Sequence, residues 1–315
     1  MNLFDNAEAT LRLPLIVAPM FLVSSPELTI AASRAGVVGS LPAANARTAG
    51  DLDQWMGQIH QALNTGQLPW LLNMIVHKTY DRFAAEIELV KRYQPSIVTT
   101  ALGSPERVLD TVKSYGGKVI ADVITPAMAR KAAAAGVDGL ILVTHGAGGH
   151  TGKFNPLAFI AEVREFWDGP LGIAGCISGG RDVLSMLTAG VDFVLSGTRF
   201  IVASESMVAD GYRDMLISAG MDDVIETRAV SGVMANWMRQ SLENAGIDPA
   251  ADNRSGVDFS GNIVTANKAW KDVWSAGQGV GNIRTKQSAA QIVDSMVAEF
   301  RAAASATRQL LNQYA

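Results

Sequence analysis

The segment Ala135–Gly152, AGVDGLILVTHGAGGHTG, contains a helix end, a buried strand and a glycine-rich loop in direct succession. Gly136 is placed to end a helix, and Gly139–Val143 is a continuous apolar run typical of strands buried on both faces of a parallel sheet. The phrase AGVDG recurs as AGVDF at Ala189–Phe193, again between a helical pattern and a short apolar run. This repetition indicates successive strand–helix units and therefore an α/β fold.

Eight such units can be read along the chain of 315 residues, a length that TIM barrels reach as a single domain. The predicted strands are Leu13–Ala18, Val37–Ser40, Trp70–Met74, Ile97–Thr100, Lys118–Ala121, Gly139–Val143, Leu171–Ala174 and Phe193–Leu195. The predicted helices are Pro26–Ala35, Leu52–Leu63, Ala84–Tyr93, Pro105–Ser114, Ala127–Ala135, Pro156–Phe166, Val183–Ala189 and a final Ser288–Leu311. Eight units favour a closed (β/α)₈ TIM barrel, and an open doubly wound sheet is the alternative.

The alternation stops after the eighth predicted strand. We expect residues 1–210 and 272–315 to form the barrel, and residues 211–271 to form a small, mainly helical insertion over its mouth, with Met234–Asn244 as one helix. Met234, Trp237, Met238 and Trp270 could line an apolar pocket there, but we favour the interpretation that they form the insertion's own core.

Composition excludes several classes of function. The net charge is −4, from 26 basic and 30 acidic residues without a basic cluster, so nothing predicts nucleic-acid binding. The single cysteine, Cys176, has no partner for an internal disulfide. Neither a secretory signal nor an apolar stretch long enough for a membrane span is present in the sequence. We therefore expect a soluble, cytoplasmic protein, whose oligomeric state the sequence does not indicate.

The glycine-rich loop that follows the sixth predicted strand lies where TIM barrels place their active sites. It matches neither the dinucleotide-binding nor the P-loop pattern, because Thr151 and Phe154 stand at required positions. The loop holds His145 and His150 but no Asp, Glu or Cys, so we expect no metal site. A histidine at this place is a candidate general acid or base, or else simply a hydrogen-bonding partner of the loop.

Glycine-bearing turns follow the seventh and eighth predicted strands, at Ile173–Asp182 and Val194–Phe200. Backbone N–H groups at these two strand ends are the usual phosphate site of a TIM barrel. We therefore favour phosphate binding over two ordinary tight turns. Cys176 is interpreted as a small filler in the first turn, because no His or Asp partner for a nucleophile is evident nearby in the sequence.

Two further segments can contact a flat ligand. Val17–Met20 ends the first predicted strand with small, rigid residues, and Asn73 near the end of the third carries an amide that can pair with a heterocycle. Taken alone, Val17–Met20 would be interpreted as a plain turn that ends the strand, and a structural loop cap is the alternative for Asn73.

Four motifs in order, APM at 18–20, GAGGHTG at 146–152, SGTRF at 196–200 and WSAGQGVG at 274–281, resemble the nitronate monooxygenase family. The resemblance covers nearly the whole chain, and it implies a TIM barrel that binds FMN. It implies His150 as the catalytic residue. The cofactor-binding residues that it implies are Ala18, Pro19, Met20, Asn73, Gly148, Gly149, Gly175, Cys176, Gly197, Thr198, Ser275 and Gln278.

The chain departs from the family pattern at two positions. It has Gly175-Cys176 where relatives often have Gly-Gly, with a second pair at Gly179-Gly180, so the resemblance does not fix which residues donate to the phosphate. It also has Asp122 on the fifth predicted strand, where some relatives carry a lysine near the flavin. A carboxylate there would not stabilise a reduced, anionic flavin.

The resemblance implies oxidation of alkyl nitronates or nitroalkanes with FMN and O₂ to carbonyl compounds and nitrite. His150 would remove the α-proton of a neutral nitroalkane, or in its protonated form hold a preformed nitronate. The nearest rival function is an NAD(P)H-dependent flavin reductase acting on quinones or enoyl thioesters. Two more distant candidates are a non-redox barrel that holds a phosphorylated ligand and a non-catalytic protein that binds flavin.

Overall fold

The computed structural model describes residues 11–63, 68–251 and 273–314. Its eight-stranded sheet is parallel throughout, in the order β1-β9-β8-β6-β5-β4-β3-β2. A bridge between Ile16 and Val38 joins the two end strands, with hydrogen bonds from Val17 N to Val38 O (2.8 Å) and from Val38 N to Leu15 O (2.9 Å). The sheet is thus a nearly closed barrel, and the TIM-barrel prediction is confirmed. The barrel strands are β1 (Leu15–Val17), β2 (Gly39–Pro42), β3 (Trp70–Ile75), β4 (Ile97–Ala101), β5 (Lys118–Val123), β6 (Gly139–Val143), β8 (Leu171–Ala174) and β9 (Phe193–Ser196).

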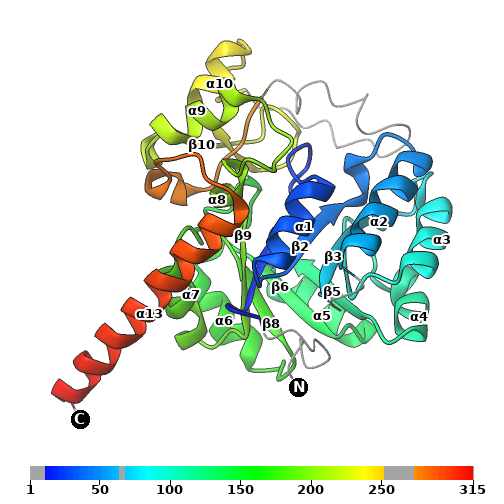
Figure 1. Cartoon of the computed structure of the whole chain (residues 1–315), viewed down its shortest axis with the longest axis horizontal. Coiled ribbons are helices and arrows are strands. Elements are labelled where there is room, and N and C mark those ends of the chain that lie inside the picture. Colours follow the sequence, from blue (N-terminus) through cyan, green and yellow to red (C-terminus); the bar gives the residue numbers. More distant parts are fainter. Residues whose placement is uncertain (1–10, 64–67, 252–272, 315) are drawn as a thin grey trace.

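Helices surround the strands, as Figure 1 shows. They are α1 (Pro26–Arg34), α2 (Ala49–Leu63), α3 (Phe83–Tyr93), α4 (Glu106–Ser114), α5 (Pro126–Ala135), α6 (Pro156–Arg164), α7 (Gly180–Thr188), α8 (Thr198–Ile201) and α13 (Ala289–Tyr314). Three of them begin with the same local signal, a Ser, Thr or Asn cap followed by proline. The side chains of Ser25, Thr125 and Asn155 accept hydrogen bonds from backbone N–H groups of the first turn, and proline fits there because that turn needs no donor.

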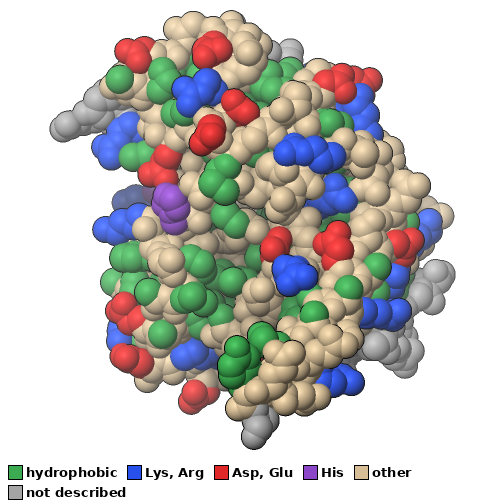
Figure 2. Space-filling view, turned by 90° about the vertical axis from the view of Figure 1, so that its left-hand side faces the viewer, with side chains coloured by type: hydrophobic (Ala, Val, Ile, Leu, Met, Phe, Trp, Pro, Cys, Tyr) green, Lys and Arg blue, Asp and Glu red, His purple; other side chains and the backbone are tan. Residues whose placement is uncertain are grey.

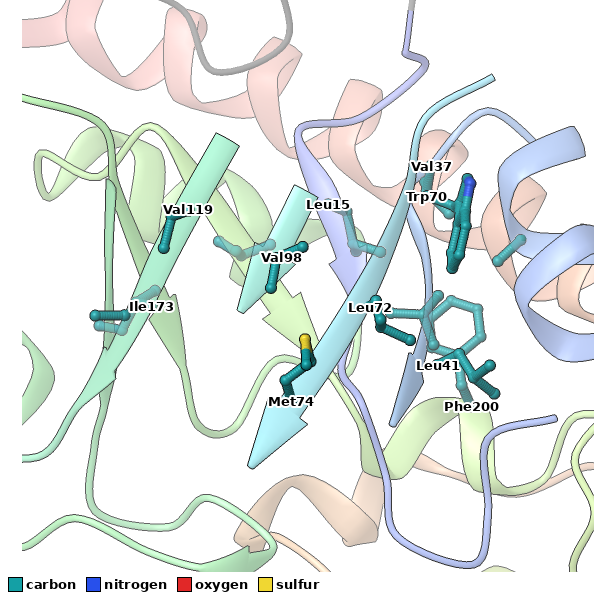
Figure 3. Close-up of a cluster of buried hydrophobic side chains, with 14 of the residues drawn as sticks. Leu15, Val37, Leu41, Trp70, Leu72, Met74, Val98, Val119, Ile173 and Phe200 are labelled. Atoms are coloured by element: carbon teal, nitrogen blue, oxygen red, sulfur yellow. The ribbon is translucent and has the colours of Figure 1, made fainter. Parts of the chain in front are cut away.

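Two apolar layers hold the barrel together. The outer layer lies between strands and helices, and Figure 3 shows part of it, from Leu15 on β1 to Phe200 on α8. The inner layer fills the barrel itself and includes Ile16, Leu71, Ile120 and Phe193. Because successive strand residues point to opposite faces, residues two positions beyond an inner-layer residue also point into the barrel, nearer its mouth.

The region after β9 contains strands as well as helices. Its described elements are α9 (Asp210–Ser218), the 3₁₀ turn η3 (Met221–Asp223), β10 (Val224–Thr227), β11 (Ala235–Met238) and α10 (Arg239–Asn244). The helix predicted for Met234–Asn244 is therefore wrong in its first half, because Ala235–Met238 pairs with β10 on one side and with β7 (Gly149–His150) on the other. The insertion is mixed rather than mainly helical in its described residues.

In the insertion Trp237 is fully buried in an apolar cluster with Ala235, Leu242 and Val273, as the core interpretation expects. Trp270 lies outside the described residues, and the domain boundaries remain predictions. Figure 1 shows α9, β10 and α10 grouped at one end of the molecule, while α13 packs along the barrel and extends beyond it. Figure 2 shows acidic and basic side chains interspersed over one face. None of the helices in the described ranges is both long and apolar enough to span a membrane.

Candidate active site

His150 stands at the mouth of the barrel on β7, a strand of only two residues. β7 pairs antiparallel with β11 of the insertion, with His150 opposite Ala235 and Gly149 opposite Asn236. The buried Asn236 side chain adds a hydrogen bond from Nδ2 to Ala147 O (2.7 Å). The loop that begins on the barrel is therefore held from above by the insertion, and this fixes the position of the histidine.

The two histidines of this loop have different surroundings. His145 Nε2 lies 3.4 Å from Glu226 Oε2 on β10, so His145 links the barrel loop to the insertion. His150 is accessible at the mouth, yet the protein around it displaces enough water to lower its pKa below the ordinary 6.5. A lowered pKa favours the neutral imidazole near pH 7, which is the form that accepts a proton.

Glycines let three segments meet in close contact beside β7. A Cβ atom on Gly148 would lie 2.7 Å from Gly277 N, and one on Gly146, whose φ is +87°, would lie 2.6 Å from Cys176 Sγ. Gln278 N donates to Gly146 O (2.9 Å), and Gly277 N donates to the hydroxyl of Thr198 (2.9 Å). We call this contact of the loop after β6, the turn after β9 and the segment 275–278 the glycine junction.

The turns after β8 and β9 carry unsatisfied backbone donors. Gly175 has φ +137° and Cys176 has φ +59°, so consecutive residues take left-handed conformations. Within the described residues, the N–H groups of Gly175, Cys176, Gly197 and Thr198 make no hydrogen bond to the rest of the protein. Such free donors at two adjacent strand ends suit a phosphate.

The second glycine pair does not belong to this set of donors. Ser178 N and Gly179 N both donate to Asp182 Oδ2 (2.9 Å each), and Gly180 N donates to Glu299 Oε2 (2.7 Å). The N-terminus of α7 is thus already occupied by carboxylates of the chain itself, which its dipole stabilises. A phosphate at the mouth has to use the turn at Gly175-Cys176 and the start of α8.

Cys176 has the surroundings of a thiol rather than of a thiolate. Burial is the main cause that raises its pKa, and Asp182 adds to the rise. From the turn after β8, its Sγ contacts Gly146 O on the loop after β6 at 3.7 Å. A raised pKa does not favour a nucleophile, while the side chain is exposed, so the space-filling role stays a prediction.

The loop after β1 forms the mouth beside α8. Ala18 N donates to Ser196 O (2.9 Å), and the sulfur of Met20 would lie 3.5 Å from a Cβ on Gly197, so Ala18-Pro19-Met20 faces the start of α8. Asn45 holds this loop: its Nδ2 donates to Met20 O (3.0 Å) and its Oδ1 accepts from Leu22 N (2.9 Å).

Polar side chains line the barrel interior on the other side of the mouth. Asn73 lies two residues beyond Leu71 of the inner layer, and its Nδ2 donates to Thr99 Oγ1 on β4 (3.0 Å). Asp122 lies two residues beyond Ile120, and its Oδ1 atom is buried without a partner among the described residues. Free N–H groups at one side of the mouth and polar side chains at the other fit a phosphorylated heterocycle such as FMN.

The segment 275–278 reaches the site through a contact that the sequence did not reveal. Tyr212 stacks on Trp274, with ring centroids 5.0 Å apart, and its hydroxyl bonds both to Ser275 O and, at 3.1 Å, to Ser275 N. Tyr212, Asn45 and Asn236 are all absent from the predicted site. Each acts on a segment distant in sequence, so no local motif marks it.

The structure therefore brings all the predicted site residues to one mouth, although their individual binding roles stay predictions. The fold and the site define a TIM barrel whose mouth carries free backbone donors and a histidine. The family model described as nitronate monooxygenase matches residues 67–299. The chain belongs to the nitronate monooxygenase family, whose members are flavin-dependent oxidoreductases.

Individual relatives are distant. A nitronate monooxygenase from Pseudomonas aeruginosa is 26% identical, with 91% of this chain and 96% of that protein covered. A (3aS,4S,5R,7aS)-5-hydroxy-7a-methyl-1-oxo-octahydro-1H-indene-4-carboxyl-CoA dehydrogenase from Mycobacterium tuberculosis is 27% identical over 73% of this chain, and the match spans only 64% of that protein. The structure of a nitroalkane oxidase from Streptomyces ansochromogenes has a TM-score of 0.80 at 23% identity and covers 94% of this chain and 97% of its own, a likeness of fold.

Proposed function

We propose that this protein binds FMN and oxidises alkyl nitronates or nitroalkanes with O₂ to carbonyl compounds and nitrite. The observation that carries the proposal is the position of His150, held by the pairing of β7 with β11 over a mouth that offers free backbone donors. The relative from Pseudomonas aeruginosa, named a nitronate monooxygenase, supports the choice of substrate class.

The chain's own groups have separable tasks in this proposal. The N–H groups of Gly175, Cys176, Gly197 and Thr198 bind the FMN phosphate, and Gly148 and Gly149 let backbone approach the ring. When bound, FMN supplies the oxidation–reduction chemistry, which no protein side chain provides.

His150 handles the proton. With a neutral nitroalkane, the neutral imidazole accepts the α-proton and leaves the nitronate in place for oxidation. With a preformed nitronate, only a protonated imidazole attracts the anion, and the lowered pKa of His150 works against that form near pH 7. The lowered pKa therefore supports the base role on nitroalkanes more strongly than the anion-holding role.

The loop offers a matched test. His150→Asn should lose aerobic nitrite formation from a neutral nitroalkane, whereas His145→Asn should retain it, because His145 pairs with Glu226 outside the glycine-lined mouth. FMN absorbance should persist in both variants. Equal activity of the two variants would remove the base role of His150, and a protein that binds no FMN would overturn the whole proposal.

A reductase that uses NAD(P)H on enoyl thioesters or quinones is the second candidate. It is favoured by the relative from Mycobacterium tuberculosis, which is named as a dehydrogenase of a CoA thioester. Rapid bleaching of the flavin by NADH or NADPH without air would support this candidate.

A further inference from the structure

Asp122 is the acidic residue that the proposed proton chemistry leaves unused. It lies near the end of β5, two residues beyond Ile120, so its side chain points into the barrel at the mouth. Its Oδ1 atom is buried and has no hydrogen-bond partner among the described residues. A buried acceptor without a donor is costly in a native fold, so this atom calls for a ligand or a proton.

The surroundings of Asp122 favour the protonated form. The flanking strands β4 (Ile97–Ala101) and β6 (Gly139–Val143) carry no titratable side chain. On β5 itself, Lys118 also points inward, but it is four residues farther from the mouth and contacts Asp138 at 3.5 Å. Burial raises the pKa of Asp122 to about 7. Two further titratable groups lie at the mouth, and neither carries a charge that would ionise Asp122: His150, on the loop after β6, has a lowered pKa, and Cys176, after β8, has a raised pKa. His145, also on the loop after β6, is directed to Glu226.

The strand order sets Asp122 apart from the phosphate donors. These donors follow β8 and β9. In the strand order β6 separates β8 from β5, and β4 and β3 lie farther around the barrel. A ligand anchored by its phosphate at β8 and β9 and lying across the mouth therefore extends toward Asn73, Thr99 and Asp122. Asn73 already donates to Thr99, while the carboxyl group of Asp122 is uncommitted.

We propose that Asp122 is a neutral carboxylic acid that donates a hydrogen bond to the flavin ring and so stabilises the negative charge that the ring gains on reduction. This inference rests on the proposed FMN binding. A carboxylic acid has an O–H donor, whereas a carboxylate only accepts and would repel that charge. An acid kept neutral by an apolar site is a known way to supply such a donor near neutral pH. In this form Asp122 no longer places an anion beside the ring.

The protonation state of Asp122 sets the sign of the pH effect. Below pH 7 the acid is intact and donates. As the pH rises through about 7, the carboxyl ionises, the donor is lost and the reduced flavin becomes less stable relative to the oxidised flavin. We expect ionisation to weaken binding of reduced relative to oxidised FMN by about tenfold, which is a fall of ~30 mV for a two-electron couple.

The test measures the reduction potential of the bound flavin by equilibration with redox dyes, from about pH 5.5 to about pH 8.5, a range that brackets the raised carboxyl pKa. Asp122→Asn keeps the shape and offers an N–H donor that does not titrate. Asp122→Leu removes the hydrogen bond altogether. Asp110→Asn makes the same chemical change at an exposed position of α4, away from the mouth, and serves as the control.

Wild-type protein and Asp110→Asn should show the extra fall in potential above pH 7, whereas Asp122→Asn should lack it. Asp122→Leu should have the lower potential at every pH. Identical curves for all four proteins would overturn the role of Asp122 while leaving FMN binding intact. Oxidised FMN binding, followed by fluorescence quenching, separates the two ideas, because failure of the wild-type chain to bind FMN would overturn both.

Discussion

Substituting Gly148 by alanine tests whether the glycine junction forms part of the cofactor site. The added Cβ would lie 2.7 Å from Gly277 N and 3.0 Å from the carbonyl carbon of Ala276, both of them backbone atoms that cannot rotate away. Relief requires the loop after β6 to move away from segment 275–278. That movement weakens the hydrogen bonds from Gln278 N to Gly146 O and from Gly277 N to Thr198 Oγ1.

The cost can be estimated from those two bonds. At about 1 kcal/mol for each hydrogen bond, reclosing the junction around FMN costs about 2 kcal/mol. That free energy corresponds to a roughly 30-fold higher Kd for FMN. The assay is titration of the flavin-free protein with FMN, followed by flavin fluorescence, together with urea unfolding to measure the change in stability.

Two further variants sharpen the test. Gly277→Ala places a Cβ 2.8 Å from Gly146 O, so it should open the same junction, and the double variant should cost little more than either single one. Gly50→Ala, near the start of α2, meets nothing closer than 3.6 Å and should bind FMN normally. If Gly148→Ala lowered the stability but bound FMN like the wild-type protein, the junction would be structural only.

Three other predictions concern single residues. His150→Asn should reduce turnover of a neutral nitroalkane by about 10²–10⁴-fold. In the wild-type protein that turnover should fall as the pH drops through a pKa below 6.5. A fall in turnover that is already centred above pH 6.5 would contradict the lowered pKa of His150. Glu86→Ala should lower the free energy of unfolding by about 3–5 kcal/mol in urea, because buried Glu86 contacts Arg82 Nη2 at 2.7 Å. The exposed control Glu88→Ala should change that free energy by less than about 0.5 kcal/mol. Equal effects of the two substitutions would refute the role of burial. Bound FMN should slow alkylation of Cys176, followed by mass spectrometry, and an unchanged rate would place the phosphate elsewhere.

The barrel could be predicted from the sequence because its strands are short, continuously apolar runs between helices with clear ends. The strand at Gly139–Val143 was predicted at its observed bounds, and the signal there is local. The strand at Ala235–Met238 was missed because its pairing with β7 and β10 is made by segments distant in the sequence, while its Met and Trp residues also suit a helix.

The candidate site was predictable to a similar extent. Glycines and His150 form recognisable local patterns, so the sequence placed them at strand ends. The raised pKa of Asp122 was not predictable, because it depends on burial in the folded barrel. Nor was the use of Asp182 and Glu299 to occupy the N-terminus of α7, since Glu299 comes from a helix more than a hundred residues away.

The proposed reaction is tested most directly by mixing the FMN-loaded protein with propionate 3-nitronate in the absence of air and following the flavin absorbance. We expect the nitronate alone to bleach the flavin, and we expect O₂, once admitted, to restore the colour and release nitrite. A flavin that stays oxidised with the nitronate but is bleached by NADH or NADPH would contradict the proposed reaction and identify a nicotinamide-dependent reductase.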